Sequence, residues 1–363
     1  MRILYIANIR FPTEKAHGVQ IAKTCEAFAG SGHQVELVVT NRSSSIIDTP
    51  FDYYAVRSNF TITRIGVPKT VSWGPAGFLF ESLMFSIRAA AYARKWKPDI
   101  VYGRDEMPLS FIARALPIVW ETHIGSWNVF ARFVARRAHQ IVTISQGLKE
   151  FYMACRVPAD RITVAHDGID LVQFEGAVSK DEARKQLGLG GQKRIAMYIG
   201  RLDSWKGTST LFEASALLPG DITVVVIGGE EKQWKELQIR FPQIVFLGPR
   251  PYRELRDIQA AADVLVLPNT GLSTVSAAYT SPLKLFSYMA SRRPIVASDL
   301  SSIREVLDDS AAFFVVPDDP QALAEGIIQA FGTEGNPRAE EAYALVGEYS
   351  WNRRAERILA VLE

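Results

Sequence analysis

The hydrophobic positions along this chain fall into short apolar runs separated by longer amphipathic segments. The runs within Arg2–Ile9, Val35–Thr40 and Ile100–Tyr102 are typical of buried strands, because they are short and largely apolar. The segments Gly18–Ala29 and Phe78–Lys97 carry apolar residues every three or four positions and predict helices. Strands that alternate with helices predict parallel sheets covered by helices on both faces.

The same alternation returns in the second half, after a junction at 171–194 that is rich in charge and glycine. A final helix is predicted over 339–362 with a kink at Tyr349–Trp351, and 268–280 is predicted as a loop. Further strands are predicted at 118–120, 141–144, 162–164, 195–199, 222–227, 244–247, 264–267, 295–298 and 312–316, and further helices at 208–218, 231–240, 252–261, 281–291, 301–307 and 319–331.

These elements predict an α/β protein built from two parallel-sheet domains that face a central cleft. The N-terminal domain is predicted over 1–175, with a C-terminal helix at 349–363 that packs back on it. The C-terminal domain is predicted over 185–345. A length of 363 residues, with 48% hydrophobic and 22% charged residues, agrees with two globular domains.

Cysteine usage and the absence of long apolar runs indicate where the protein works. Cys25 and Cys155 have no paired spacing, which predicts neither a disulfide framework nor a zinc site and indicates a reducing compartment. The start of the chain does not read as a signal peptide, and no run of about 18 apolar residues follows. A cytoplasmic location is therefore expected.

Positive charge is concentrated in the first half of the chain. Residues 1–175 contain 20 Lys and Arg against 15 Asp and Glu, whereas the remainder contains 21 against 24. Two basic helical patches, Arg88–Lys97 and Arg132–Arg137, are interleaved with apolar residues. They predict either solvated helix faces or a surface for an anionic membrane or an acidic acceptor. The second reading adds the inner face of the plasma membrane as a location, and no nucleic-acid partner is expected.

The strongest candidate site is the loop after the strand at 195–199. Arg201 and Lys206 follow the turn at Gly200, and a helix begins after Gly207. Loops at the carboxyl ends of parallel strands bind ligands, and two cations there suit a diphosphate. Ser281 and Pro282 read as the N-cap and first residue of a second helix, whose free N–H groups could face the same anion.

A second candidate site lies in the first half. His123 directly follows a predicted strand end, and a structural and a functional role remain open for it. Arg104, Asp105 and Glu106 follow another strand and are weaker candidates for the acceptor side. The dinucleotide fingerprint GxGxxG is absent after the first strand, which argues against a dehydrogenase.

Four motifs occur one after another along the chain. They are His17-Gly18, His123, the GRLDSWKG stretch at Gly200–Gly207, and Tyr279–Ser298, with the HDGID stretch at 166–170 between the second and third. In these motifs the chain resembles, end to end, the family-4 glycosyltransferases. That resemblance implies the GT-B fold of two Rossmann-like domains and a retaining, metal-independent transfer from a nucleotide sugar.

The resemblance also implies residue roles. Arg201 and Lys206 neutralise the diphosphate of the leaving group, and His123 positions the transferred sugar or contacts the leaving group. Donor binding is expected at Gly18, Arg201, Lys206, Ser281, Pro282, Leu283, Lys284, Ser287 and Glu305. No metal and no cofactor are expected, and the co-substrate is a UDP- or GDP-linked sugar.

One part of the family pattern is missing. The family carries two glutamates eight residues apart, the first contacting the donor sugar and the second the ribose, but this chain has Tyr279 and Ser287 at those positions. A serine can still bond a hydroxyl, without charge assistance and with shorter reach.

The function expected from the resemblance is sugar transfer to a glycan or lipid-linked acceptor in bacterial cell-surface polysaccharide synthesis. Because of Ser287, a catalytically impaired GT-B protein that binds a nucleotide or a partner is the first alternative. A nucleotide-sugar epimerase is the second, and the five histidines of the chain argue against it.

Overall fold

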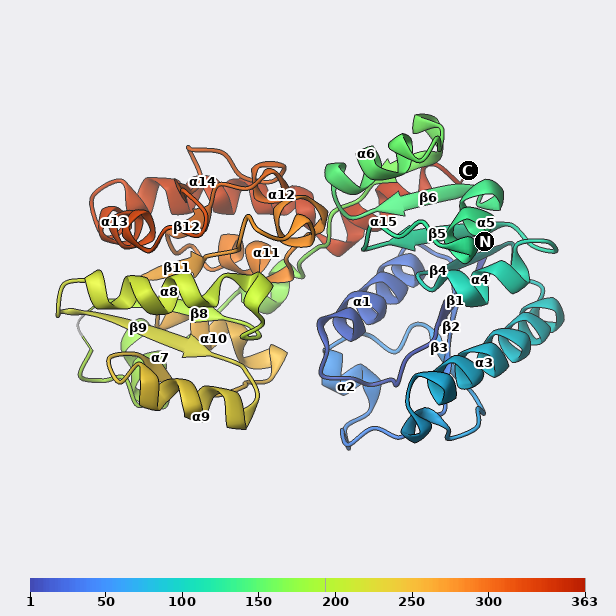
Figure 1. Ribbon diagram of the computed structural model, residues 1–363, viewed down its shortest axis with the longest axis horizontal. Coiled ribbons are helices and arrows are strands. Elements are labelled where there is room, and N and C mark those ends of the chain that lie inside the picture. The colour runs from blue at the N-terminus through green and yellow to red at the C-terminus, as the bar shows by residue number, and fades with distance from the viewer. Residues whose placement is uncertain (193, 363) are drawn as a thin grey trace. The chain divides into compact units, whose positions relative to one another are not determined.

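The computed structural model describes residues 1–192 and 194–362, and the chain divides into two compact units (Figure 1). The first unit contains Met1–Asp167 and the segment from Trp351 onward, and the second contains Gly168–Ser350. The boundaries predicted at 175 and 185 lie in the segment that follows Gly168. Residue 363, the end of the predicted C-terminal helix, lies outside the described residues. The predicted class, two parallel-sheet α/β units, is confirmed.

The first unit is built on a seven-stranded parallel sheet of order β3-β2-β1-β4-β5-β6-β7. Ile3 of β1 pairs with Val35 on one side and with Ile100 on the other, so the first strand of the chain lies inside the sheet. The strands are β1 (Arg2–Ala7), β2 (Gln34–Thr40), β3 (Thr61–Ile65), β4 (Ile100–Gly103), β5 (Ile118–Thr122), β6 (Gln140–Thr143) and β7 (Ile162–Val164).

Some helices of the first unit begin where a short polar side chain satisfies a free backbone N–H group. Asn128 accepts a hydrogen bond from the N–H of Ala131 at the start of α5, and Ser145 does the same for Leu148 at the start of α6. The helices are α1 (Ala16–Gly30), α2 (Pro50–Tyr54), α3 (Pro75–Trp96), α4 (Glu106–Ile112), α5 (Val129–Arg137), α6 (Gln146–Ala154) and α15 (Trp351–Leu359), with 3₁₀ turns η1 (Val71–Trp73) and η2 (Ala159–Arg161).

The second unit is built on a six-stranded parallel sheet of order β10-β9-β8-β11-β12-β13. Its strands are buried on both faces, which explains their nearly continuous apolar sequences. The strands are β8 (Arg194–Ile199), β9 (Ile222–Ile227), β10 (Val245–Phe246), β11 (Val264–Leu267), β12 (Ile295–Ser298) and β13 (Phe313–Val315).

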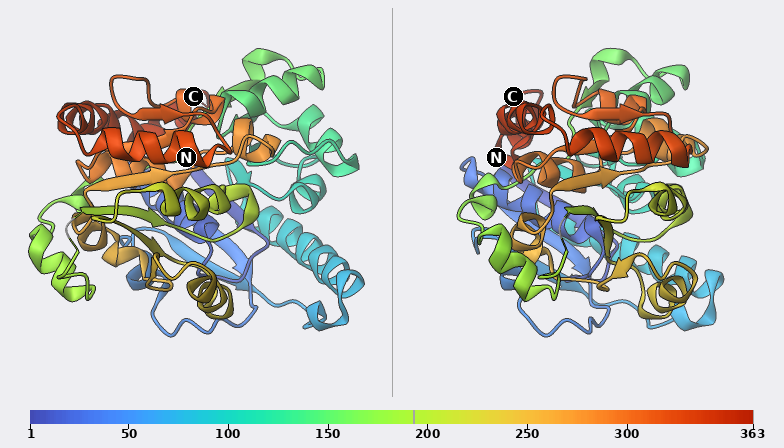
Figure 2. Two further views of the ribbon diagram at one scale, coloured as in Figure 1. Left: turned by 60° about the vertical axis from the view of Figure 1, so that its left-hand side comes forward. Right: turned by 90° about the vertical axis from the view of Figure 1, so that its left-hand side faces the viewer.

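Helices cover this second sheet on both sides (Figure 2). One face packs against α10, α11 and α14, and the other packs against α8 and α13. The helices are α7 (Lys180–Gln186), α8 (Thr208–Ala214), α9 (Glu231–Arg240), α10 (Leu255–Ala260), α11 (Leu283–Ala290), α12 (Ser301–Arg304), α13 (Pro320–Ala330) and α14 (Gly335–Val346), with 3₁₀ turns at Leu171–Phe174, Ser204–Lys206, Ser215–Leu217, Tyr252–Glu254 and Gly347–Tyr349.

Two segments differ from the sequence-based expectation. The predicted loop 268–280 contains a π-helical turn, Val275–Tyr279, which the hydroxyls of Ser301 and Ser302 hold by donating to the carbonyls of Ala277 and Ser276. The predicted final helix is two helices, α14 and α15, separated by a 3₁₀ turn and the extended Ser350. No helix in the described part of the chain is long and apolar enough to cross a membrane.

Candidate active site

The loop between β8 and α8 has the geometry of a close backbone approach. Gly200 follows β8 with φ of 153°, and Gly207 precedes α8 with φ of 66°, a conformation that L side chains rarely adopt. A Cβ on Gly207 would lie 1.8 Å from the carbonyl oxygen of Pro268. Both glycines are therefore required by the backbone path, which carries Arg201 and Lys206 between them.

Helix α11 begins beside this loop. The N–H of Ile199 donates to the hydroxyl of Tyr288 over 2.9 Å, and a Cβ on Gly200 would lie 2.9 Å from Nζ of Lys284. The helix starts at Leu283 with Pro282 at its N-cap, one residue later than predicted, because Pro282 still has extended backbone angles. The first turn of α11 and the cationic loop therefore come together, as parallel-sheet topology requires.

Arg201 and Lys206 occupy different environments in the loop. Arg201 is exposed and pairs with Asp203 at 3.0 Å, whereas the Nζ of Lys206 lies 3.5 Å from the centre of the Trp205 ring. Burial lowers the pKa of Lys206 to about 8, Arg201 adds to this, and Asp203 opposes it. At neutral pH both side chains are cationic, which suits an anionic ligand.

Ser287, where the family carries its second glutamate, is 2% exposed. Its hydroxyl accepts a hydrogen bond from Nε2 of Gln259 and donates to the carbonyl oxygen of Lys284, each over 2.9 Å. Tyr279 ends the π-helical turn, and Glu305 directly follows α12 in a half-buried position. Ser281 is buried, and Leu283 is half-buried at the helix start. Donor contacts for these residues stay predictions.

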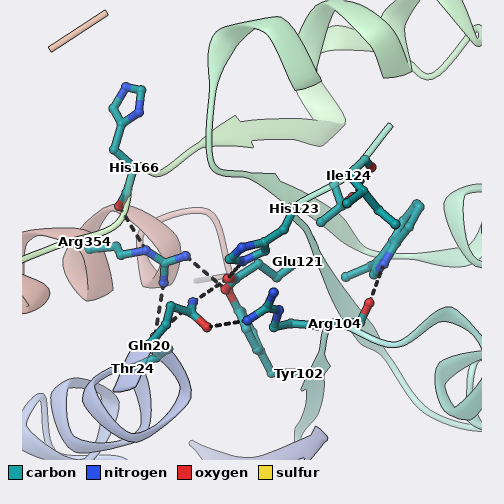
Figure 3. A network of polar contacts seen from close by, with 11 residues as sticks. Gln20, Thr24, Tyr102, Arg104, Glu121, His123, Ile124, His166 and Arg354 are labelled. Carbon is teal, nitrogen blue, oxygen red and sulfur yellow. Dashed lines mark hydrogen bonds and ion pairs between the residues drawn. The ribbon is translucent and has the colours of Figure 1, made fainter. Parts of the chain in front are cut away.

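In the first unit, His123 lies directly after β5 and makes one short contact (Figure 3). Its Nε2 is 2.5 Å from Oε1 of Glu121. Because a carboxylate oxygen only accepts, this contact places the imidazole proton on Nε2. Burial, with the nearby Arg104 guanidinium, lowers the pKa of His123 to about 4 despite the opposing effect of Glu121. The ring is therefore neutral at pH 7.

Glu121 is fully buried and is the centre of this polar network (Figure 3). Besides His123, it accepts hydrogen bonds from Nε2 of Gln20 and from the hydroxyl of Tyr102. Burial by itself would raise the pKa of Glu121, but the Arg354 guanidinium and the contact with His123 hold it well below its usual range. The carboxylate is ionised, so it orients His123 as an acceptor.

Arg354 reaches this network from α15, far along the sequence. Its guanidinium lies 3.0 Å from Glu121 and donates to the carbonyl oxygen of His166 and the hydroxyl of Thr24 (Figure 3). The sequence prediction assigned no role to Arg354 or Glu121. A signal exists, because Arg354 lies on the same helical stripe as the buried Trp351 and Ile358, where an arginine needs a buried partner.

The other first-unit candidates lie in helix α1 and directly after strand β4. Gly18 is the third residue of α1, and a Cβ there would lie 2.1 Å from the Tyr54 hydroxyl, so packing alone requires a glycine. Arg104 follows β4 and donates to Gln20 at 3.1 Å. Burial raises the pKa of both Asp105 and Glu106.

Among the described residues, no three His, Cys, Asp or Glu side chains are grouped to hold a metal ion.

Two family models match the chain, one in each half. Residues 17–173 match the model described as "Glycosyltransferase Family 4", and residues 193–332 match "Glycosyl transferases group 1". The chain therefore belongs to the family-4, group 1 glycosyltransferases and is a transferase.

Among relatives, the putative teichuronic acid biosynthesis glycosyltransferase TuaC of Bacillus subtilis is 28% identical over 76% of this chain and 72% of its own length. The D-inositol 3-phosphate glycosyltransferase of Corynebacterium urealyticum is 28% identical over 55% of this chain and 50% of its own length. This chain thus spans about half of the inositol-phosphate enzyme.

Solved structures confirm the GT-B fold. Anabaena Alr3699/HepE in complex with UDP matches with a TM-score of 0.78 at 17% identity over 100% of this chain and 99% of that one. Sucrose-phosphate synthase from Thermosynechococcus elongatus matches with a TM-score of 0.78 at 18% identity over 99% and 98%.

Proposed function

We propose that this chain transfers a sugar from a nucleotide-sugar donor to a glycan or lipid-linked acceptor, with retention of the anomeric configuration and without a metal ion. The observation that carries the proposal is that the loop with Arg201 and Lys206 begins beside the first turn of α11 at the end of β8. Two cations and free helix N–H groups form an environment for a diphosphate.

The leaving diphosphate gains negative charge as the sugar–oxygen bond breaks, and stabilising that charge is the main demand of the reaction. In the proposed mechanism, Arg201 and Lys206 take this role in place of a metal ion. His123, held neutral with its proton directed to Glu121, positions the sugar and does not act as a general base. A departing phosphate oxygen accepts the proton of the incoming hydroxyl.

The biological setting is inferred from the relatives. TuaC is named for teichuronic acid synthesis, and Alr3699/HepE was solved with UDP and with UDP-glucose. We therefore place this chain in bacterial surface-polysaccharide synthesis, with a UDP- or GDP-linked donor, in the cytoplasm or at the inner face of the plasma membrane. Arg104, Asp105 and Glu106 are proposed for the acceptor side.

Substitution of the two loop cations tests the proposal. Arg201→Ala and Lys206→Ala should each lower the transfer rate by roughly 10²-fold or more, because a preorganised charge on a developing anion contributes about 3 kcal/mol. Lys235→Ala, which removes an exposed lysine of the same unit, is the matched control and should leave the rate unchanged. Near-normal rates in both loop variants would contradict the assignment.

The donor for this assay is first found by thermal shift, since a ligand at 100 times its Kd adds about 2.7 kcal/mol to the free energy of unfolding.

Metal independence has its own test. Adding EDTA should leave the transfer rate nearly unchanged, because the proposed charge stabilisation comes from Arg201 and Lys206. A strict requirement for Mg²⁺ or Mn²⁺ would contradict this part of the proposal.

The alternative is a binding protein without turnover, and position 287 favours it, because Ser287 is buried and bonded within its own unit. Calorimetric titration with the nucleotide sugars together with a transfer assay separates the two functions. Tight binding of a donor with no transfer to any surface-glycan acceptor supports the alternative.

A further inference from the structure

A surface of the first unit is unusually apolar. Seven large apolar side chains within 71–87 are exposed, and Trp73 is 73% and Leu79 56% accessible. Single exposed apolar residues are ordinary, but contiguous groups of them mark interaction sites. The residues of this apolar face are Val71, Trp73, Phe78, Leu79, Phe80, Leu83 and Ile87.

Most of the face lies on α3, and Val71 and Trp73 lie in the 3₁₀ turn η1 that precedes this helix. Leu79, Leu83 and Ile87 are each four residues apart and so lie on one side of the helix, next to Phe80. The buried side of the same helix is formed by other residues, among them Phe85, Ala89 and Ala93. The helix therefore has a separate stripe that packs on its unit, which leaves the apolar face available to a partner.

The exposed charges of residues 66–97, the segment that carries the apolar face, have one sign. Between residues 66 and 97 the only acid is Glu81, which is buried and paired with Arg42. The cations of this segment are all exposed: Lys69, Arg88, Arg94, Lys95 and Lys97. Arg94 and Lys95 lie about two helical turns beyond Ile87 on the same helix.

We propose that the apolar face and its flanking cations dock on the surface of an anionic lipid bilayer. The apolar side chains enter the boundary between headgroups and acyl chains, and the lysines and arginines bind anionic headgroups. A second copy of this chain fits less well, because a two-fold interface would bring the same cations together from both copies. This docking deepens the proposed function, because it brings the protein to the membrane surface where a lipid-linked acceptor lies.

Vesicle sedimentation tests this docking without any assay of sugar transfer. The unmodified protein should bind vesicles that contain phosphatidylglycerol, and bind vesicles of phosphatidylcholine alone much more weakly. The triple variant Leu79→Ser, Leu83→Ser, Ile87→Ser and the double variant Arg94→Gln, Lys95→Gln should each need roughly tenfold more anionic lipid for half-binding. The matched control is Ile239→Ser with Leu272→Ser, two apolar residues of the second unit that are 84% and 90% exposed.

Three results would overturn the docking proposal. They are no binding of the unmodified protein to anionic vesicles, unchanged binding by both variants, and a dimer in light scattering that the triple variant abolishes. Because no nucleotide is present, none of these results bears on sugar transfer, and loss of transfer in the Arg201 variant does not bear on docking.

A second inference comes from a buried amine in the other unit. The Nζ of Lys284 is buried and has no hydrogen-bond partner among the described residues. It lies 3.9 Å from the centre of the Tyr198 ring and packs against Gly200. An isolated ammonium in such a place is costly, so an anion is the partner that this position lacks.

The groups that face Lys284 do not supply that anion. From the loop after β8, Lys206 faces it with a like charge, and Asp203 is already engaged by Arg201. The N-terminus of α11, where Lys284 lies, also favours negative charge over positive. Burial, and then Lys206, lowers the pKa of Lys284 well below its usual value. Both effects favour the neutral form of the amine when no ligand is bound.

We infer that binding of a sugar-nucleotide diphosphate at Arg201 and Lys206 is coupled to uptake of a proton by the Lys284 amine. The solvent supplies the proton, the nitrogen lone pair accepts it, and the resulting ammonium joins the diphosphate as a third cation. The inference rests on the proposed function, because it requires the donor in this loop.

Calorimetry of UDP-glucose, GDP-mannose and ADP-glucose in two buffers of different ionisation enthalpy measures this uptake. Their diphosphates do not titrate near pH 8, so proton exchange with the buffer comes from the protein. The unmodified protein should take up protons on binding at pH 8, and Lys284→Met and Lys284→Gln should take up about one fewer. Lys206→Met measures the share of the neighbouring lysine, and Lys235→Met is the exposed control.

The outcomes separate the two proposals. Binding without proton uptake, or uptake unchanged in both Lys284 variants, overturns the inference and leaves the proposed function standing. No binding of any of the three sugar nucleotides by the unmodified protein contradicts the proposed function, and the inference with it.

Discussion

Ser287 shows how a position with an expected functional role can also be tied into the packing of its own unit. Its hydroxyl is enclosed, bonded to the Gln259 amide and to the carbonyl of Lys284. The second amide atom of Gln259, Oε1, is buried without a partner among the described residues. The pair is therefore only partly satisfied, and its two members contribute unequally to stability.

Single and double substitutions measure this inequality. Ser287→Ala should lower the free energy of unfolding by about 1–3 kcal/mol, because it leaves the buried Nε2 of Gln259 unpaired. Gln259→Met should cost less, since it also removes the unpaired Oε1, and the double variant should be more stable than Ser287→Ala alone. Thermal and urea unfolding of the three variants check the order. A Gln259→Met variant less stable than Ser287→Ala would contradict the argument.

At the scale of elements, α15 contributes to a site it follows by more than 200 residues along the chain. Arg354 is 3% and Glu121 0% exposed, so the ion pair between α15 and β5 is fully buried. Burying one charge without the other is strongly destabilising, whereas a matched pair is close to neutral. The helix therefore fixes the protonation of Glu121 and, through it, the orientation of His123.

Removing the guanidinium should reverse the pH dependence that Glu121 gives to stability. In the unmodified protein the depressed pKa of Glu121 adds stability above its unfolded pKa, which is lost as the pH falls through the acidic range. In Arg354→Met, burial should raise the pKa of Glu121 instead, so stability should increase as the pH is lowered from 8 to 5. The loss at pH 8 should be about 3–5 kcal/mol.

Unfolding of Arg354→Met and of the double variant Arg354→Met, Glu121→Gln across this pH range checks the prediction. The double variant should recover most of the stability and lose the pH dependence. A single variant whose stability does not rise as the pH is lowered from 8 to 5 would show that Arg354 does not control Glu121.

At the scale of the molecule, the chain leaves the first unit after Asp167 and returns to it at Trp351. Near the two crossings, Ile169 forms a parallel bridge with Ser350 and donates to the carbonyl of Tyr349. Each unit has its own sheet and core, so the units are expected to differ in stability. Helix α15 belongs to the first unit.

Truncation after Ser350 should therefore affect the units differently. The first unit should lose cooperative unfolding, because Trp351 is missing from its core and Glu121 keeps a buried, uncompensated charge. The second unit should unfold as before and keep its affinity for the nucleotide sugar. Hydrogen exchange read separately for each unit checks this. Loss of protection in the second unit as well would contradict the independence of its core.

Much of this arrangement is predictable from the sequence, and there are physical reasons why the remaining features are not. The alternation of apolar runs and amphipathic helices is local information, so both sheets and the cationic loop at Arg201 follow from it. The buried network around Glu121 does not, because it joins residues of α1, β5 and α15 that only tertiary packing brings together. The same holds for the bond between Gln259 and Ser287, since no periodicity marks a buried polar pair.

The connectivity of the units has a consequence for synthesis on the ribosome. The second unit is an insertion between two parts of the first, so all of Gly168–Ser350 is made before Arg354 emerges. Until then the nascent first unit has a carboxylate at Glu121 whose cation does not yet exist, while the second unit already has every residue of its sheet. We therefore expect the second unit to reach its native state first. The first unit folds only after α15 has been made, so the two sheets fold in the reverse of the order in which they are translated.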